Sequence, residues 1–237
     1  KRLYTRLGYG FARQRNGASA MRAVVSLSTV CGKWQYEGGG AFYKNADIYK
    51  MDKTLIEGLD VLDTNIRMLD QSRIGSILTG DKEALENGQN VYGMIIQNTN
   101  PLIVAPESSL VRKGFSREDL FVCVHEQFMT ETAKYADIIL PATTFVEHDD
   151  IYIAGGHQHI TFGPKLINPI GEAKSNHYVL QELAKRLGAK HKGFEMTERE
   201  IIDWTLKSSN HGSLINIEKN GWKDLQPDFN SSHFING

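Results

Sequence analysis

Two clusters of polar side chains in the middle of this chain carry the residue types best suited to binding chemistry. The first cluster supplies amides from Gln97, Asn98 and Asn100. The second supplies an imidazole and a carboxylate from His125 and Glu126. Short amides pair hydrogen-bond donors with acceptors, and a carboxylate accepts hydrogen bonds from a guanidine-like or ribose-bearing ligand. These groups predict a site for a small organic ligand.

The elements that must position these clusters are three predicted β-strands. The runs Val91–Ile96, Leu120–Val124 and Ile138–Leu140 are short, rich in β-branched residues and separated by helix-sized gaps, which is typical of βαβ units in a parallel sheet. Each run ends at a polar cluster, and the third is followed by Thr143. Ligands of such sheets bind in the crevice beyond the carboxyl ends of the strands. We therefore expect all the clusters to line one crevice.

Each candidate residue also has a purely structural explanation. Asn98 and Asn100 precede Pro101, and Asn and Pro are favoured in turns even without a ligand. Thr130 can cap the helix expected after the second strand, whose N-terminus would in turn favour anions. The sequence leaves the ligand-binding and structural explanations open.

Two further motifs imitate known sites. Gly8-Tyr9-Gly10 begins like a dinucleotide fingerprint, but Arg13 replaces the third glycine and no strong strand precedes it, so no NAD(P) site is expected. Two interpretations of this segment stay open: a Gly/Arg loop that touches a phosphate or cofactor, and a plain structural turn. His157 and His159 would share one strand face in a Gly-rich loop, which favours polar lining of a pocket or a solvated loop over a metal site.

Composition narrows the function classes. The 237 residues include 27 basic and 28 acidic side chains, so no overall charge favours nucleic acid or an anionic membrane. No apolar run approaches the roughly 18 residues of a membrane helix. Cys31 and Cys123 form no CxxC pair and are predicted to be buried thiols. No Ser-His-Asp arrangement, nucleophile elbow or phosphate-binding P-loop is present.

The predicted fold is α/β, with three layers and a mostly parallel Rossmann-like sheet flanked by helices. Helices are expected at 18–30, 67–77, 175–187 and 197–206, and a hairpin or extended excursion at 150–162. We expect residues 1–40 to end one α/β domain or link two domains, residues 41–206 to form a dinucleotide-binding α/β domain, and residues 207–237 to form a polar tail that leads to a missing domain. The chain begins at Lys1 rather than Met, which favours part of a longer polypeptide.

Beyond these patterns, the chain resembles one known family. The string Thr130-Glu131-Thr132-Ala133, followed by Ala136–Thr143, resembles the molybdopterin-dependent oxidoreductases, the group of formate dehydrogenase, periplasmic nitrate reductase and dimethyl sulfoxide reductase. Asn100-Pro101, Gly171–Lys174 and the Gly/Arg pattern of Arg6–Gly17 also fit. The resemblance covers roughly residues 6–190, with little similarity at 42–88.

The resemblance implies a cofactor and partners. The family binds molybdenum or tungsten between two pyranopterin guanine dinucleotides, each held by an α/β domain, and exchanges electrons between a small substrate and an electron carrier. This chain would be the latter half of the α/β core of a bacterial enzyme, cytoplasmic or, as an open alternative, periplasmic. The matching residues place Gln97, Asn98 and Asn100 at the dinucleotide, Glu126 and Thr130 at its guanosine half, and His125 beside them.

The chain also departs from the family pattern. His157, a candidate cofactor contact, replaces the family's Arg, and Asp150 replaces a usual Gly. Nothing resembles the N-terminal cysteine cluster that would hold a [4Fe–4S] centre, a residue that ligates the metal, or the C-terminal β-barrel. We therefore predict no catalytic or metal-binding residue and no activity for this chain alone. The alternative is a non-catalytic nucleotide-binding or scaffold module that kept the fold.

Overall fold

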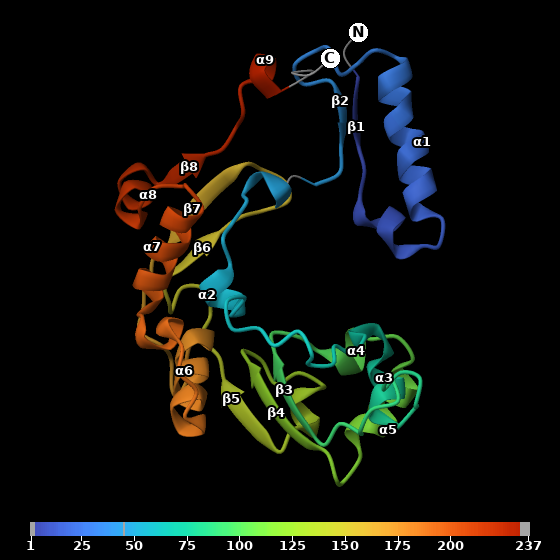
Figure 1. The fold of residues 1–237 in the computed structure, drawn as a ribbon, viewed down its shortest axis with the longest axis vertical. Helices are drawn as coiled ribbons and strands as arrows, with labels where there is room; N and C mark the ends of the chain where they lie inside the picture. The colour runs from blue at the N-terminus through green and yellow to red at the C-terminus, as the bar shows by residue number, and fades with distance from the viewer. Residues whose placement is uncertain (1–2, 45, 233–237) are drawn as a thin grey trace. The chain divides into compact units, whose positions relative to one another are not determined.

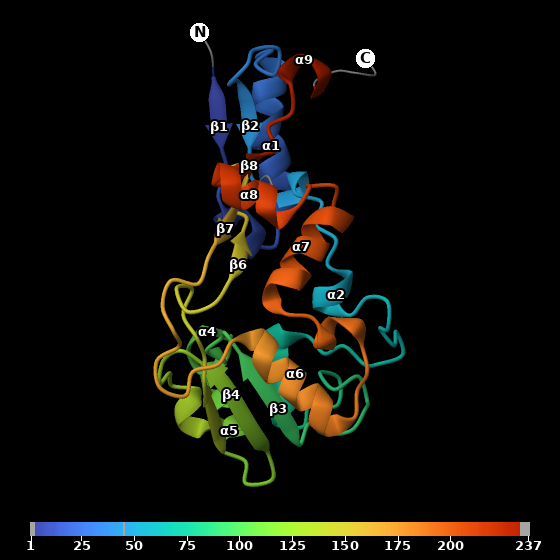
Figure 2. The same cartoon turned by 90° about the vertical axis from the view of Figure 1, so that its left-hand side faces the viewer.

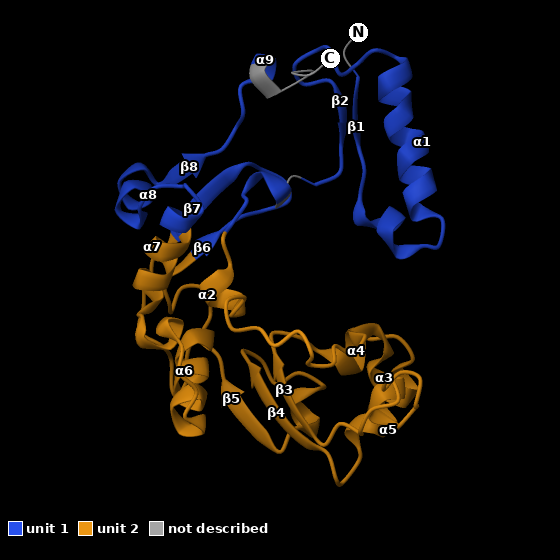
Figure 3. Cartoon of the chain, viewed as in Figure 1, with its two compact units in different colours: residues 1–51, 151–162, 206–237 blue, residues 52–150, 163–205 orange. Residues whose placement is uncertain are grey.

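The computed structural model describes residues 3–44 and 46–232, and the chain divides into two compact units (Figure 3). Unit 1 comprises residues 1–51, 151–162 and 206–237, and unit 2 comprises residues 52–150 and 163–205. The units interleave along the chain, whereas the sequence predicts consecutive segments. Compact units need not be the domains of a longer protein, so the domain boundaries at residues 40 and 206 stay a prediction.

The centre of unit 2 is a parallel three-stranded sheet in the order β3-β4-β5 (Figure 1). Its strands are β3 (Gly93–Gln97), β4 (Phe121–Glu126) and β5 (Ile138–Pro141). Ile95 pairs with Cys123, and Cys123 pairs with Ile138. The three strands predicted from the β-branched runs are confirmed, in the predicted parallel arrangement.

Helices flank this sheet, as the predicted α/β fold requires. The helices α3 (Ile74–Leu78), α4 (Pro101–Val104) and α5 (Ser108–Phe115) lie on one side of it, and α6 (Asn176–Leu187) lies on the other (Figures 1 and 2). The main core of unit 2 forms where the first three helices meet the strands, because both present apolar side chains there. Its buried residues are Leu78, Ile96, Leu102, Val111, Phe115, Leu120, Val122, Val124 and Ala133.

A short segment around Lys174 extends the sheet beyond β5. Ala142 and Lys174 form a parallel bridge. The Thr143 N–H donates to the Lys174 carbonyl at 3.1 Å, and the Lys174 N–H donates to the Pro141 carbonyl at 3.0 Å. Residues after β5 are thereby fixed to the segment that precedes α6.

Local capping signals locate two helices, as the sequence predicts. The Ser175 hydroxyl accepts from the Tyr178 N–H, and α6 ends at Gly188, whose φ is +69°. At α7 (Glu198–Ser208), the Thr197 hydroxyl accepts from the Glu200 N–H, and the Glu200 carboxylate accepts from the Thr197 N–H. This reciprocal pair is the predicted capping box.

Two helix predictions in unit 2 are wrong. The connection from β4 to β5 contains only the 3-10 turn η4 (Ala133–Tyr135), because Asp137 already returns to the sheet and accepts from the Val122 N–H at 2.7 Å. The helix expected at 67–77 begins later, as η3 (Gln71–Arg73) and then α3. Arg67 instead uses its guanidinium group to bind the carbonyls of Leu85 and Gln89.

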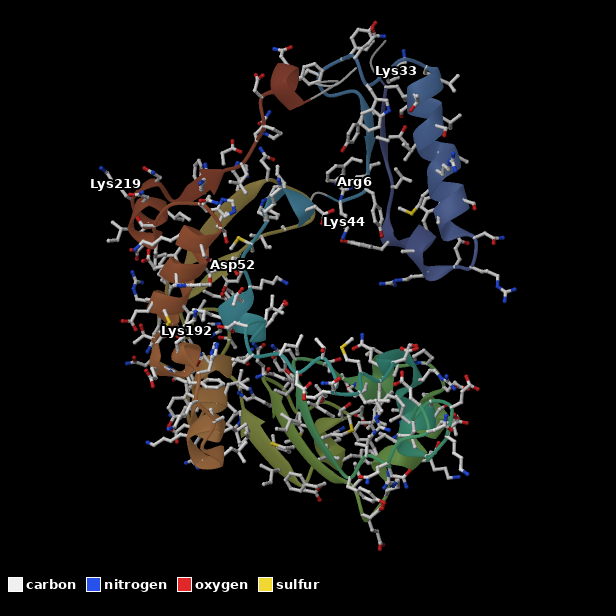
Figure 4. All side chains as sticks on the ribbon, in the orientation of Figure 1. Arg6, Lys33, Lys44, Asp52, Lys192 and Lys219 are labelled. Carbon is white, nitrogen blue, oxygen red and sulfur yellow. The ribbon has the colours of Figure 1, made fainter. Side chains whose placement is uncertain are left out.

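Other short elements complete unit 2. The helix α2 (Thr54–Glu57) begins after Asp52, whose carboxylate accepts from the Thr54 N–H. Lys192 lies on the 3-10 turn η5 (Lys192–Glu195), and Lys192 and Asp52 are both labelled in Figure 4. The Lys192 ammonium group lies 3.7 Å from the Asp60 carboxylate and 5.2 Å from the centre of the Trp204 ring.

Unit 1 contains a strand that the sequence does not predict. The strand β1 (Tyr4–Arg6) precedes the 3-10 turn η1 (Tyr9–Arg13) and α1 (Gly17–Val30), and it pairs in parallel with β2 (Gly40–Phe42). A short strand therefore precedes Gly8, where the sequence predicts no strong one. A Cβ atom on Gly17 would lie 1.6 Å from the Phe11 carbonyl oxygen, so only glycine fits where the helix begins.

The predicted burial of both cysteines is also wrong. Cys31 is exposed, because it caps the C-terminal end of α1 at the surface. Cys123 is only half-buried on β4, and burial raises the pKa of its thiol. Neither forms a disulfide.

The rest of unit 1 is built largely around a second three-stranded sheet, in the order β6-β7-β8. Its strands are β6 (Asp150–Tyr152), β7 (His159–Gly163) and β8 (Trp222–Asp224), and β7 and β8 run antiparallel. The excursion predicted at 150–162 thus contains two neighbouring strands. The short helices are η2 (Ala46–Ile48), α8 (Leu214–Asn220) and α9 (Phe229–Ser232).

The polar tail contributes more structure than the sequence predicts, since β8 joins the sheet and Leu214 and Ile217 are buried. Within the described residues, no helix has the length and apolar content to cross a bilayer.

Candidate functional site

The three predicted loops leave the sheet of unit 2 at the same edge. Gln97, the last residue of β3, pairs with His125, and Glu126, the last residue of β4, pairs with Pro141 of β5. Because the strands are parallel and adjacent, their carboxyl ends are aligned. The expected convergence of the three loops at one edge is confirmed, with Glu126 at the end of β4 and Asn98 and Thr143 just beyond β3 and β5.

Asn98 turns the chain sharply at the end of β3. Its φ is +54°, a left-handed conformation that asparagine tolerates better than most residues. The Asn98 N–H donates to the His125 carbonyl at 3.4 Å, and the side chain is exposed. Asn98 is therefore a turn residue whose amide remains accessible to a ligand.

Asn100 ties the first loop to the second. Its Oδ1 accepts from both the N–H of Thr132, at 3.2 Å, and the hydroxyl of Thr132, at 2.7 Å. The same hydroxyl oxygen accepts from the Leu102 N–H at 3.2 Å. The carbonyl of the Asn100 amide thus has a structural role, and its Nδ2 is the group it can offer to a ligand.

His125 is enclosed at the end of β4, with only 1% of its surface exposed. Its Nδ1 lies 3.1 Å from Gln97 Nε2, and its Nε2 lies 3.1 Å from the Lys174 carbonyl. Both ring nitrogens are therefore occupied by protein groups. Of these two candidates, only the half-exposed Gln97 has side-chain surface available to a ligand.

The second loop follows Glu126 and leads to η4, and Thr130 lies within it. Glu126 is half-buried, and its Oε1 accepts from the Gln127 N–H at 2.7 Å, which leaves acceptor capacity on the carboxylate. The Thr130 hydroxyl accepts from the Ala133 N–H at 3.1 Å, so the capping explanation holds for this side chain. Between Glu126 and Thr130 in the sequence, Phe128 is 72% exposed and Met129 is 62% exposed, and they add apolar surface to this loop that no sequence pattern signals.

Glu147, which is only 4% exposed, is the side chain to which the backbone of the third loop is hydrogen-bonded. Its Oε2 accepts from the N–H and the hydroxyl of Thr144, and its Oε1 accepts from the Ile170 N–H at 2.6 Å. Hydrogen bonds from the Thr144 and Ile170 backbone hold the pKa of Glu147 below its ordinary value. The spacing Thr144-x-x-Glu147 was the signal for this role.

Side-chain hydrogen bonds also connect the second and third loops. Gln127 Nε2 donates to the Thr143 carbonyl at 3.0 Å, and the Thr143 hydroxyl lies 2.8 Å from His148 Nδ1. With the Asn100–Thr132 contact, all three loops are linked. The edge of the sheet is therefore a connected surface of amides, a carboxylate and hydroxyls.

His157, the remaining candidate, belongs to unit 1. Its carbonyl lies 2.5 Å from the hydroxyl of the buried Tyr49, and its Nδ1 accepts from the His159 N–H at 3.1 Å. The His157 and His159 rings are 5.5 Å apart. His157 thus lies in unit 1, whereas the other six candidates lie in unit 2. Among the described residues, no three His, Cys, Asp or Glu side chains are arranged to hold a metal ion.

Comparisons with known proteins agree on one family. The sequence matches the family model described as molybdopterin oxidoreductase over residues 3–186. It is 33% identical to the probable oxidoreductase YoaE of Bacillus subtilis, over 91% of this chain and 31% of that protein. It is 28% identical to the trimethylamine-N-oxide reductase of Haemophilus influenzae, over 83% of this chain and 27% of that protein.

The solved structures include one with the same fold. The acetylene hydratase of Pelobacter acetylenicus matches with a TM-score of 0.51 and 24% sequence identity, over 62% of this chain and 20% of that one. The present chain spans 31% of the length of YoaE and 27% of the length of the trimethylamine-N-oxide reductase.

Proposed function

This chain belongs to the molybdopterin oxidoreductase family, and from that membership we propose that it binds one pyranopterin guanine dinucleotide of a molybdenum or tungsten cofactor. The whole protein would exchange electrons between a small substrate and an electron carrier. The observation that supports this proposal is the convergence of the loops after β3, β4 and β5 at one edge of the sheet.

The groups at this edge fit one end of such a dinucleotide. Gln97, Asn98 and Asn100 offer amide groups, and Glu126 offers a carboxylate that can accept from the N–H groups of a purine or the hydroxyls of a ribose. Phe128 and Met129 expose apolar surface next to Glu126, which suits the face of a flat ring. A purine nucleotide needs this combination of edge hydrogen bonds and apolar contact.

The residues of this chain would bind and orient the cofactor, and the reaction itself would belong to the metal. When bound, the cofactor would supply the metal centre that exchanges electrons with the substrate. The amides of the first loop and the carboxylate of Glu126 would hold the nucleotide part of the cofactor. The linked loops keep these hydrogen-bonding groups in fixed positions.

The decisive experiment is to produce the longer protein in a host that makes the molybdenum cofactor. The purified protein should contain molybdenum or tungsten together with a guanine nucleotide, measured by elemental analysis and by chromatography of the released nucleotide. A folded protein with neither would refute the proposal. A protein that contains guanine nucleotide but no metal would instead support a non-catalytic nucleotide-binding module.

A further inference from the structure

The hydrogen bonds of His125 determine which way the Gln97 amide points. His125 Nε2 lies 3.1 Å from the carbonyl oxygen of Lys174. A carbonyl oxygen can only accept, so Nε2 must carry a proton. If the ring is neutral, Nδ1, the atom that faces Gln97, then carries a lone pair.

Gln97 must therefore donate to His125. Its Nε2 lies 3.1 Å from His125 Nδ1, and only the NH₂ group of the amide can satisfy that lone pair. His125 is almost fully buried, so water does not compete for either contact. The carbonyl oxygen Oε1 of Gln97 is thus directed away from His125, on a residue that is only half-buried at the ligand edge.

We propose that Gln97 is a specificity-determining residue, which presents a hydrogen-bond acceptor to the N1 position of the bound base and so selects a base whose N1 carries a proton. The inference rests on the proposed function and adds to it a mechanism of base selection. Guanine and adenine both carry an exocyclic amine on the Watson–Crick edge, but N1 is an N–H donor in guanine and an acceptor in adenine. An acceptor held in place by His125 would favour the first pattern over the second.

The first test measures the protonation of His125 in the unmodified chain. Nuclear magnetic resonance of the histidine ring nitrogens should show a neutral ring with the proton on Nε2. A proton on Nδ1 would reverse the amide of Gln97 and overturn the inference. This measurement needs neither a variant nor a ligand, so it is independent of the proposed nucleotide site.

The second test measures binding of guanosine diphosphate and adenosine diphosphate by calorimetry. The unmodified chain should bind guanosine diphosphate more tightly. Gln97→Met keeps the length of the side chain but removes its acceptor, and should weaken guanosine diphosphate binding about tenfold with little change for adenosine diphosphate. Gln89→Met, at an exposed glutamine of the same unit, is the matched control and should change neither.

The outcomes separate the two proposals. Equal loss for both nucleotides, or no loss, would assign Gln97 a structural role and overturn its part in selection. If the unmodified chain bound neither nucleotide, the proposed site itself would be refuted, and base selection by Gln97 with it. If Gln97→Met did not fold, the nucleotide preference of the unmodified chain would still decide, because equal affinity for the two bases contradicts the inference.

Discussion

Asn100 and Thr132 are hydrogen-bonded twice through a single atom, since Oδ1 of Asn100 accepts from both the backbone N–H and the hydroxyl of Thr132. Thr132 is fully buried, and its hydroxyl oxygen also accepts from the Leu102 N–H. This arrangement joins the loop after β3 to the loop after β4. It also links the stability of unit 2 to the geometry of the candidate site.

Replacing Thr132 tests that link. Thr132→Val keeps the side-chain shape but leaves the Leu102 N–H and part of the Asn100 amide without their partner. We expect a loss of about 1–3 kcal/mol in the free energy of unfolding, measured by urea denaturation. Thr132→Ser retains the hydroxyl and should lose less. Equal stability of Thr132→Val and the unmodified chain would show that the contact contributes nothing.

The lowered pKa of Glu147 predicts how the stability of unit 2 changes as the pH falls. Its pKa is lower in the folded chain than in the unfolded chain, because the Thr144 and Ile170 N–H groups stabilise the charged carboxylate. Its contribution to stability is therefore fully present above the unfolded pKa, about 4.3, and is lost as the pH falls through the lower folded pKa. Glu147→Gln should be less stable at neutral pH and should lose less stability on acidification.

The measurement for Glu147 is the thermal midpoint as a function of pH, from about neutral to about pH 3. Glu118→Gln, at an exposed carboxylate, is the control and should follow the unmodified chain. Parallel curves for Glu147→Gln and the unmodified chain would contradict the role assigned to Glu147.

Replacing Glu126 should weaken nucleotide binding and leave the chain folded. Glu126→Ala removes the carboxylate at the end of β4 and should weaken guanosine diphosphate binding by about 1–3 kcal/mol if it leaves a buried ligand group unpaired. Calorimetry on the folded variant is the measurement, and Glu118→Ala is the control. Unchanged affinity would remove Glu126 from the site.

The left-handed turn at Asn98 predicts the relative stabilities of variants at this position. With φ at +54°, glycine should be tolerated as well as asparagine, whereas Asn98→Ala should cost about 1 kcal/mol in the free energy of unfolding. The measurement is urea denaturation of the three proteins. An alanine variant as stable as the glycine variant would indicate that the turn relaxes to another conformation.

Much of unit 2 could be predicted because its signals are local. Ser175, Gly188 and the Thr197–Glu200 pair mark helix ends through contacts within a few residues. The strands β3 to β5 show as β-branched runs, and parallel strands necessarily bring their loops to one edge. Those two facts were enough to predict where the candidate residues meet.

The remainder depends on contacts distant in sequence. The strand β1 has three residues and no apolar run, and its partner β2 begins at Gly40, after an intervening helix. The enclosure of His125 requires Lys174, which joins the sheet through a bridge that no local pattern signals. The sequence therefore predicts His125 as a ligand contact, whereas in the structure both of its ring nitrogens contact other groups of the protein.

The strand order β3-β4-β5 also has a practical consequence for anyone who purifies this chain. Among the described strands, β4 is the sole partner of β3, and Gly93–Gln97 carries no charged side chain. An uncharged outer strand is a template for intermolecular pairing, and Ile95, in its middle, is 63% exposed. Aggregation at high concentration should start there, and Ile95→Lys should raise the solubility limit.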